Sequence, residues 1–228
     1  MPDYRVRFTK EEHFKFLSHL ELIRAIERAL RRAEIPLAYS EGFHPHAKLS
    51  FGPALAVGVN SMDEYFDMQL TADLDPEAIT EVLNNHLPQG IHINAIRKCL
   101  HNVKPLNAVI NRAAYVVVLN MNKNVIDEVT ETVNHLMEHE ELMVLRSNKN
   151  GQKMVNIRLW LHNLNTEIIN ETQLQIRITG EIGSGGNLRP EDIIKQIVHP
   201  VEIINITRVG LWHEEKDKIV KPLDLCGV

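Results

Sequence analysis

Residues 16–36, FLSHLELIRAIERALRRAEIP, predict the first helix of the chain and organise the elements around it. Ser18 is a suitable N-cap, and Glu21 follows it at the spacing of a capping box. Apolar residues then recur at helical intervals until Pro36 ends the run. One side of this helix is therefore expected to pack on a sheet, while its other side carries arginine.

Alternating, β-branched and aromatic residues predict strands on both sides of this helix. The expected elements of the first half are strands at 4–8, 64–70 and 91–96, extended segments at 36–40 and 47–51, and a helix from Asp75 to about Leu87. Their order is β-α-β-β-α-β. Such a unit forms an antiparallel sheet with both helices on one face, the ferredoxin-like arrangement.

The second half repeats this plan with one strand extra. We expect strands at 115–119, 142–145, 154–161, 174–178 and 201–209, a turn at 148–151, and helices at 124–139 and 190–198. The sequence thus predicts an α+β protein with two tandem ferredoxin-like units. The expected boundaries are 1–100 and 113–213 for the units, 99–112 for the linker and 214–228 for a tail.

Composition restricts the class of protein. A chain of 228 residues with 44% hydrophobic content can hold two compact domains of roughly 100 residues. It has neither an apolar run of about 20 residues nor the apolar segment of a secretion signal, so we expect a cytoplasmic protein without a membrane partner. Its two cysteines, Cys99 and Cys226, are far apart and are predicted to be free thiols. They suggest no metal or cluster site.

Charge is distributed unevenly along the chain. The net charge is −5, yet residues 1–56 carry nine Lys and Arg against seven Asp and Glu. Four arginines of the first helix fall within an arc of about 100° on its polar side, namely Arg24, Arg28, Arg31 and Arg32. Guanidinium groups match phosphate oxygens, although a basic face near a helix C-terminus is also typical of a solvated surface. An anionic partner would therefore dock on the N-terminal part.

The segment 37–59 that follows, LAYSEGFHPHAKLSFGPALAVGV, has the composition of a shaped loop. Its glycines and prolines fix unusual backbone geometry. Phe43 is the aromatic residue best placed to stack on a nucleobase, and Lys48 is a further phosphate ligand. The alternative is that the aromatic residues, which are concentrated in residues 1–66, pack the first domain.

Histidines add possible chemistry to this region. His44 and His46 alternate along an extended segment and would face the same side, while His19 lies on the apolar side of the helix. With Tyr39 they are the candidates for metal-free acid–base cleavage of RNA. Hydrogen bonding within the loop is the favoured interpretation, and a metal site would need further ligands.

Residues 16–59 closely resemble the signature of the radical-SAM-linked protein family, DUF2344, and the resemblance extends more loosely over most of the chain. It implies the free-standing form of the domain, a separate radical-SAM enzyme as a partner, and a role in RNA or ribosome metabolism. No CxxxCxxC motif is present, so we expect no iron–sulfur cluster and no other cofactor. His44 stands where the family more often has Asn. The tandem plan is also similar to the repeat-associated RNA-processing proteins of CRISPR systems.

These observations lead to three hypotheses. The first is an RNA-binding accessory protein in which the four arginines and Lys48 contact phosphates while the loop at 42–52 reads shape or stacks a base. The second is a protein that presents substrate to a separate radical-SAM enzyme. The third is a metal-independent ribonuclease. A binding role is favoured over an enzymatic one.

Overall fold

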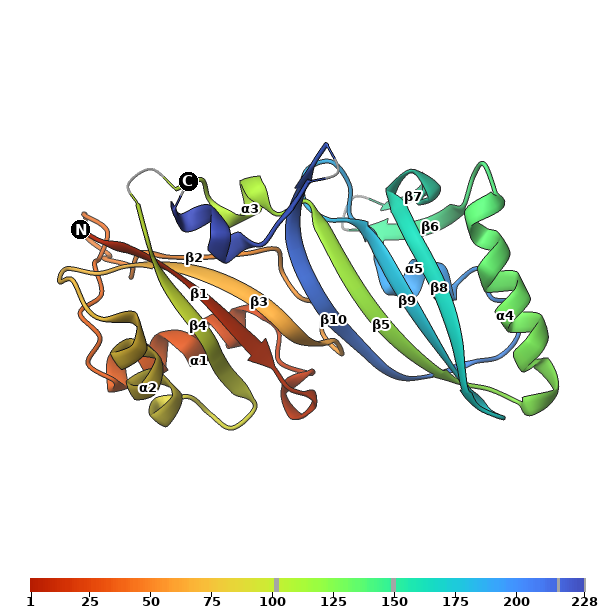
Figure 1. The fold of residues 1–228 in the computed structure, drawn as a ribbon, viewed down its shortest axis with the longest axis horizontal. Coiled ribbons are helices and arrows are strands. Elements are labelled where there is room, and N and C mark those ends of the chain that lie inside the picture. Colours follow the sequence, from red (N-terminus) through yellow and green to blue (C-terminus); the bar gives the residue numbers. More distant parts are fainter. Residues whose placement is uncertain (101–102, 149–150, 217, 228) are drawn as a thin grey trace. The chain divides into compact units, whose positions relative to one another are not determined.

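The computed structural model describes residues 1–100, 103–148, 151–216 and 218–227. The chain has a mixed α+β fold built on mostly antiparallel sheet, and it divides into two compact units (Figure 1). The first unit contains residues 1–111 and 210–228, and the second contains residues 112–209. The segment expected as a tail therefore belongs to the first unit.

The first unit follows the element order expected from the sequence. Its strands and main helices are β1 (Asp3–Lys10), α1 (His19–Arg32), β2 (Leu49–Phe51), β3 (Asn60–Gln69), α2 (Pro76–His86) and β4 (Ile91–Cys99), with a short 3-10 helix, η1 (Glu12–Phe14), before α1. The strand order is β4-β1-β3, with β2 on the far side of β3, and these pairs are antiparallel. The region 37–59 is thus attached to this sheet through β2 and through a bridge between Leu37 and Leu70.

One face of this sheet is apolar and lies under α1 and α2 (Figure 1). Val6 of β1 is opposite Phe66 of β3, and both side chains are fully buried. Leu22, Ile26 and Leu30 of α1 reach the same core. The helical apolar spacing therefore explains which side of α1 is covered and which side stays exposed.

The other face of the sheet is charged and lies under the C-terminal segment. Arg5 is completely buried and donates from Nε and Nη2 to the two carboxylate oxygens of Asp67, at 2.7 and 2.9 Å. It also donates to the carbonyl of Pro222, at 3.0 Å, and to that of Lys104, at 3.1 Å. The segments on this face are α3 (Leu106–Val109) and the 3-10 helix η5 (Pro222–Gly227), while β11 (Lys218–Val220) pairs with β10 (Glu202–Glu215).

The prediction of two free thiols was wrong. Cys99 at the end of β4 and Cys226 in η5 form a disulfide across 127 residues of sequence. The backbone N–H of Leu100 also donates to the carbonyl of Cys226, at 2.9 Å. A long separation in sequence gave no sign of this proximity, because the return of the C-terminal segment to β4 depends on the tertiary fold.

The second unit contains a four-stranded arrangement and a separate hairpin. Its elements are β5 (Arg112–Asn120), η2 (Lys123–Val125), α4 (Ile126–His135), η3 (Leu136–Glu138), β6 (Met143–Asn148), β7 (Gly151–Asn156), η4 (Arg158–Trp160), β8 (Leu161–Asn170), β9 (Gln173–Glu181), α5 (Pro190–Ile194) and the part of β10 (Glu202–Glu215) up to residue 209. The strand order is β10-β5-β9-β8, and β6 pairs with β7 in a two-stranded sheet. The hairpin is the extra part of this unit.

Two expectations for the second unit were wrong. The strand expected at 154–161 is divided between the end of β7, the 3-10 helix η4 and the start of β8, and β8 itself was not predicted. The helix expected at 190–198 ends at Ile194. The turn expected at 148–151 includes Lys149 and Asn150, which lie outside the described residues.

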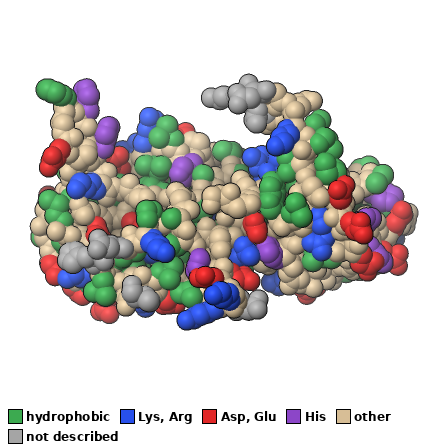
Figure 2. Space-filling model, turned by 90° about the horizontal axis from the view of Figure 1, so that it is seen from above, with side chains coloured by type: hydrophobic (Ala, Val, Ile, Leu, Met, Phe, Trp, Pro, Cys, Tyr) green, Lys and Arg blue, Asp and Glu red, His purple; other side chains and the backbone are tan. Residues whose placement is uncertain are grey.

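Acidic, basic and hydrophobic side chains are interspersed on the face drawn in Figure 2. That face therefore shows no continuous basic patch. Within the described ranges, no helix is long and apolar enough to span a membrane.

Candidate nucleic-acid interface

The start of α1 is fixed by a complete capping box. The backbone N–H of Ser18 donates to Glu21 Oε2 at 2.8 Å, and the backbone N–H of Glu21 donates to Ser18 Oγ at 3.3 Å. Ser18 Oγ also donates to Glu21 Oε2, at 2.7 Å, and the two hydrogen bonds that Ser18 donates to this carboxylate are the main reason that the pKa of Glu21 lies below its ordinary value. Each favours the carboxylate form. The sequence prediction that Ser18 is the N-cap is confirmed. The capping box fixes the residue at which α1 begins.

All four arginines of α1 are exposed, but they differ in their partners. Arg31 Nη2 pairs with Glu27 Oε1 at 2.6 Å, and Arg32 donates to the carbonyl of His86. Neither Arg24 nor Arg28 forms an ion pair or a hydrogen bond within the part of the chain that the structure describes. Their guanidinium groups are therefore available to an external anion.

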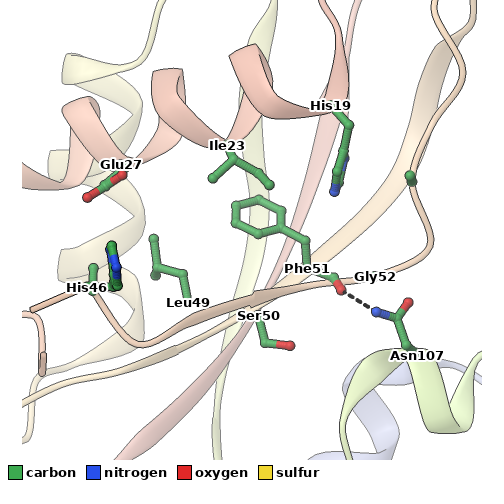
Figure 3. Close-up of a pocket in the computed structure, with 11 residues that line it drawn as sticks. His19, Ile23, Glu27, His46, Leu49, Ser50, Phe51, Gly52 and Asn107 are labelled. Carbon is green, nitrogen blue, oxygen red and sulfur yellow. Dashed lines mark hydrogen bonds between the residues drawn. The ribbon is translucent and has the colours of Figure 1, made fainter. Parts of the chain in front are cut away.

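A pocket of about 470 Å³ lies between α1 and β2 (Figure 3). Its lining comes from one side of α1, from the segment 46–54 and from α3, and consists of His19, Ile23, Glu27, His46, Ala47, Leu49, Ser50, Phe51, Gly52, Ala54 and Asn107. The volume is in the range of small-molecule sites. His19, Ile23 and Glu27 follow one another at steps of four residues, so they form one row along the helix.

The middle of the pocket is apolar. The ring of Phe51 stands between α1 and β2, with Ile23 and Leu49 beside it (Figure 3). Phe51 stacks on Phe66 with ring centroids 5.2 Å apart and planes inclined by 24°. The ring of His19 meets Phe51 edge-on at 6.0 Å. These aromatic contacts hold the pocket floor in a defined position.

Polar groups occupy the two ends of the pocket. Glu27 and His46 lie at one end, and His19 lies at the other (Figure 3). Asn107 is near the second end, where its Nδ2 donates to the carbonyl of Phe51 at 3.1 Å. The side chain of Ser50 points away from α1 (Figure 3). The pocket thus presents an apolar centre between hydrogen-bonding ends.

The structure separates the histidines that the sequence grouped together. His19 and His46 line the pocket, at opposite ends, whereas His44 is exposed and does not line it. Tyr39 is also outside the lining, and its backbone forms a bridge to Ala47. The arrangement therefore brings together two of the four residues proposed for acid–base chemistry.

The loop at residues 41–45 connects two short extended segments that pair with each other. The backbone N–H of Ser40 donates to the carbonyl of His46 at 2.8 Å, and the N–H of His46 donates to Ser40 Oγ at 3.0 Å. Between them Gly42 has a φ of +116°, a conformation that favours glycine. Phe43 at the tip is fully exposed, at 102% of its reference area. The tip thus offers an aromatic ring to solvent.

Lys48 does not join the arginines at the pocket. Its Nζ donates to Gln69 Oε1 at 2.9 Å, and Gln69 Nε2 donates to Asp3 at 2.9 Å. It lines a separate hollow of about 260 Å³ together with Asp3 and Asp67. Since side chains alternate along an extended segment, Lys48 and its neighbour Leu49 point to opposite sides.

Of the residues that line the pocket, only His19 and His46 were candidates from the sequence, and Glu27, Phe51 and Asn107 are the most informative of those that were not. Glu27 follows His19 by eight residues, so the helical row contained a signal for it. The sequence did not distinguish Phe51 from the other aromatic residues of the N-terminal part. Asn107 comes from the segment expected as a linker, and its position depends on the packing of α3, which no local pattern indicates. Within the ranges the structure describes, no group of three or more His, Cys, Asp or Glu is placed to hold a metal.

Comparison with family models matches residues 3–190 to the family described as "Uncharacterized protein conserved in bacteria (DUF2344)". The chain belongs to the DUF2344 family. The match includes α1, the loop and every residue that lines the pocket of this DUF2344 protein. Comparison with curated proteins gives no match.

Solved structures similar to this DUF2344 protein include a chain of a Cbf5-Nop10-Gar1 complex, with a TM-score of 0.53 and 11% sequence identity. The alignment covers 93% of the DUF2344 chain and 50% of that chain. A chain of an archaeal box H/ACA sRNP Nop10-Cbf5 complex matches at a TM-score of 0.46 with 12% identity, covering 90% of this chain and 46% of the other. The DUF2344 protein thus spans about half the length of these chains, and the first likeness concerns the fold.

Proposed function

We propose that this DUF2344 protein is an RNA-binding accessory protein of RNA or ribosome metabolism, acting in the cytoplasm. The observation that carries the proposal is the row of exposed arginines on α1 beside a pocket with an aromatic centre. The arginines contact phosphates and set affinity, while the pocket and the loop set selectivity.

The charges on α1 support an anionic partner. Arg24 and Arg28 are one helical step of four residues apart and both project from the exposed side. Arg31 and Arg32 extend the same positive surface to the helix C-terminus, where the dipole favours cations. A polyanion with regularly placed phosphates can engage several of these groups at once.

The exposed aromatic tip supports a single-stranded nucleic acid in particular. Phe43 has no packing role that would account for an aromatic residue at its position. Single strands are bound by proteins that combine a positive surface with exposed aromatic rings on which bases stack. Lys48 uses one of its three ammonium N–H groups on Gln69, which leaves further donors for a phosphate.

The order of strands supports the proposal that the two units are tandem ferredoxin-like folds. In the first unit β1 lies between β3 and β4, with β2 outside β3, and in the second unit, apart from the β6-β7 hairpin, β5 lies between β9 and β10, with β8 outside β9. The overall likeness to a chain of the Cbf5-Nop10-Gar1 complex is a likeness of fold. We choose RNA as the ligand to test because the exposed arginines of α1 and the exposed ring of Phe43 combine positive charge with a surface for base stacking.

The test is RNA binding by a charge-reversal variant with a matched control. Fluorescence anisotropy with a labelled single-stranded RNA is measured across a salt series for wild type, Arg24→Glu/Arg28→Glu and Lys123→Glu/Lys153→Glu. Both double variants change the net charge equally, and the control residues are exposed positions of the second unit. We expect the arginine variant to lose about 1.4 from the logarithmic salt slope, as for two single-strand phosphate contacts, and the control to keep the wild-type slope. Equal slopes for wild type and the arginine variant would reject the proposal.

A separate radical-SAM enzyme is the second candidate partner, and the resemblance of residues 16–59 to the radical-SAM-linked signature is what favours it. In this alternative α1 and the loop form a protein-docking surface. Co-purification with such an enzyme, lost in the same arginine variant, would support it.

The ribonuclease alternative has His19 and His46 as its remaining pocket candidates. They lie at opposite ends of the pocket, and His44 lies outside it. Undiminished RNA cleavage by His19→Ala/His46→Ala would remove both from any mechanism.

A further inference from the structure

We propose that the pocket between α1 and β2 binds one unstacked nucleobase of the RNA, and that Glu27 makes it select a base with an exocyclic amino group. This inference rests on the proposed function and adds a defined subsite to it. It concerns adenine, guanine and cytosine as opposed to uracil.

The lining of the pocket suits a planar heterocycle. Ile23, Leu49 and Phe51 form an apolar middle, and the polar residues lie at the ends (Figure 3). A nucleobase has the same distribution, because its faces are apolar while its edge carries donors and acceptors. Phe51 is held from behind by its stacking on Phe66, so the floor is formed before a base arrives.

Glu27 is the group that discriminates between base edges. Its Oε1 is held by Arg31 at 2.6 Å, and no hydrogen bond to its Oε2 is formed from within the described ranges. An ionised carboxylate only accepts hydrogen bonds, so Oε2 can take the exocyclic N–H of an amino-bearing base and offers nothing to the carbonyl of uracil at that place. The ion pair with Arg31 fixes the carboxylate in this role.

The arginine row places phosphate ligands next to the pocket. His19, Ile23, Glu27 and Arg31 lie on one row of α1, and Arg24 and Arg28 lie on the adjoining exposed side. A nucleotide with its base in the pocket therefore has its phosphate near the positive surface. Base and phosphate are recognised from neighbouring rows of one helix.

Ala54 provides a way to close the pocket without disturbing the core. It lines the pocket and is itself exposed, so a larger side chain fills the opening rather than the interior. Val57, in the same segment, is 57% exposed and does not line the pocket. Ala54→Trp and Val57→Trp are therefore a blocking variant and its matched control.

The experiment is saturation-transfer NMR with AMP, GMP, CMP and UMP as probes, each added to the full chain. We expect transfer to the base protons of AMP, GMP and CMP that exceeds transfer to UMP by at least about threefold, a difference expected from one discriminating hydrogen bond. Ala54→Trp should abolish this transfer and Val57→Trp should preserve it. Glu27→Gln should bring CMP down to the level of UMP.

Two results would overturn the inference. One is transfer to all four probes that Ala54→Trp leaves unchanged, and the other is the same CMP to UMP ratio in wild type and Glu27→Gln. Native amide spectra of Glu27→Gln and Val57→Trp keep the test independent of any folding defect in Ala54→Trp.

The proposed function and this inference fail separately. If RNA binding depends on the arginines but saturation transfer to the mononucleotides persists in Ala54→Trp, only the nucleobase pocket is rejected. Pocket-dependent mononucleotide signals combined with RNA affinity that is indifferent to Arg24→Glu/Arg28→Glu reject the RNA-binding role and leave a nucleobase-binding pocket.

Discussion

The two faces of the sheet in the first unit are built from alternate residues of the same strands but are stabilised differently. The face under α1 and α2 is closed by apolar side chains such as Val6 and Phe66. The face under η5 is closed by charged groups, with Arg5 fully buried against Asp67. One residue of difference along β1 thus decides between hydrophobic burial and ion pairing.

The two faces of the sheet have different roles in the first unit. Apolar burial is non-directional and supplies stability, whereas a buried ion pair with fixed hydrogen bonds specifies which segment may lie there. Arg5 also donates to the Pro222 carbonyl, so the charged face selects the C-terminal segment. The apolar face supports α1, whose outer side is then free to carry the arginines and the pocket.

The largest effect should come from breaking the charged face. Arg5→Leu leaves the carboxylate of Asp67 without its partner and should lower the free energy of unfolding by about 3–5 kcal/mol. Urea denaturation measures the change. Arg5→Leu/Asp67→Leu should recover most of the loss, because neither charge then remains buried. A double variant as unstable as the single one would contradict this account of the face.

Removing the disulfide should be next in size. Cys99→Ser/Cys226→Ser releases a covalent link between β4 and η5 and should lower stability by about 2–4 kcal/mol. Limited proteolysis should then cut the C-terminal segment first, while α1 stays protected. Faster cleavage in α1 than in residues 218–227 would show that the two faces are not independent.

A smaller loss of stability is expected from a change in α1, which covers the apolar face of the sheet. Ser18→Ala removes the side-chain acceptor of the capping box and should reduce stability by about 1 kcal/mol. Its specific consequence is looser positioning of His19, the first residue of α1, which hydrogen exchange at the first turn would detect. Asp75→Ala, which removes the N-cap of α2, is the control, since it should destabilise similarly without loosening α1.

The smallest effect is a difference in pKa between two carboxyl groups, Glu21 at the start of α1 and Asp67 on the charged face of the sheet. Hydrogen bonds from Ser18 place the pKa of Glu21 below its ordinary 4.5, so its stabilising contribution is present above pH 4.5 and is lost as the pH falls through the lowered value. Burial raises the pKa of Asp67 above its ordinary 3.8, against the influence of Arg5, so its contribution is present below pH 3.8 and lost as the pH rises through the raised value. Carboxyl carbon NMR should show midpoints displaced in opposite directions. Displacement in the same direction would contradict the comparison.

The sequence predicted the elements of the first unit well because their signals are local. Ser18 and Glu21 marked the start of α1, and Asp75 with Pro76 marked the start of α2. In β8 the residues HNLNTE lack the regular alternation of a half-buried strand, so that strand was not predicted.

The candidate site was predicted only in part because its members meet through tertiary packing. The arginines of α1 were recognisable from helical geometry, and all four are exposed as expected. The expected grouping of His19 with His44 depended on the course of a loop, which spacing does not determine. Asn107 and Cys226 belong to segments that are distant in the sequence from the residues they contact. A local sequence pattern does not predict such tertiary contacts.

The division of the first unit into two stretches of sequence has a consequence for synthesis on the ribosome. The backbone N–H of Asn111 donates to the carbonyl of Trp212 at 3.2 Å, so the chain leaves the first unit and re-enters it at adjacent points. The whole of residues 112–209 must be translated before the segment that covers Arg5 emerges. The apolar face with α1 can therefore assemble early during translation, while the charged face waits until η5 has been synthesised.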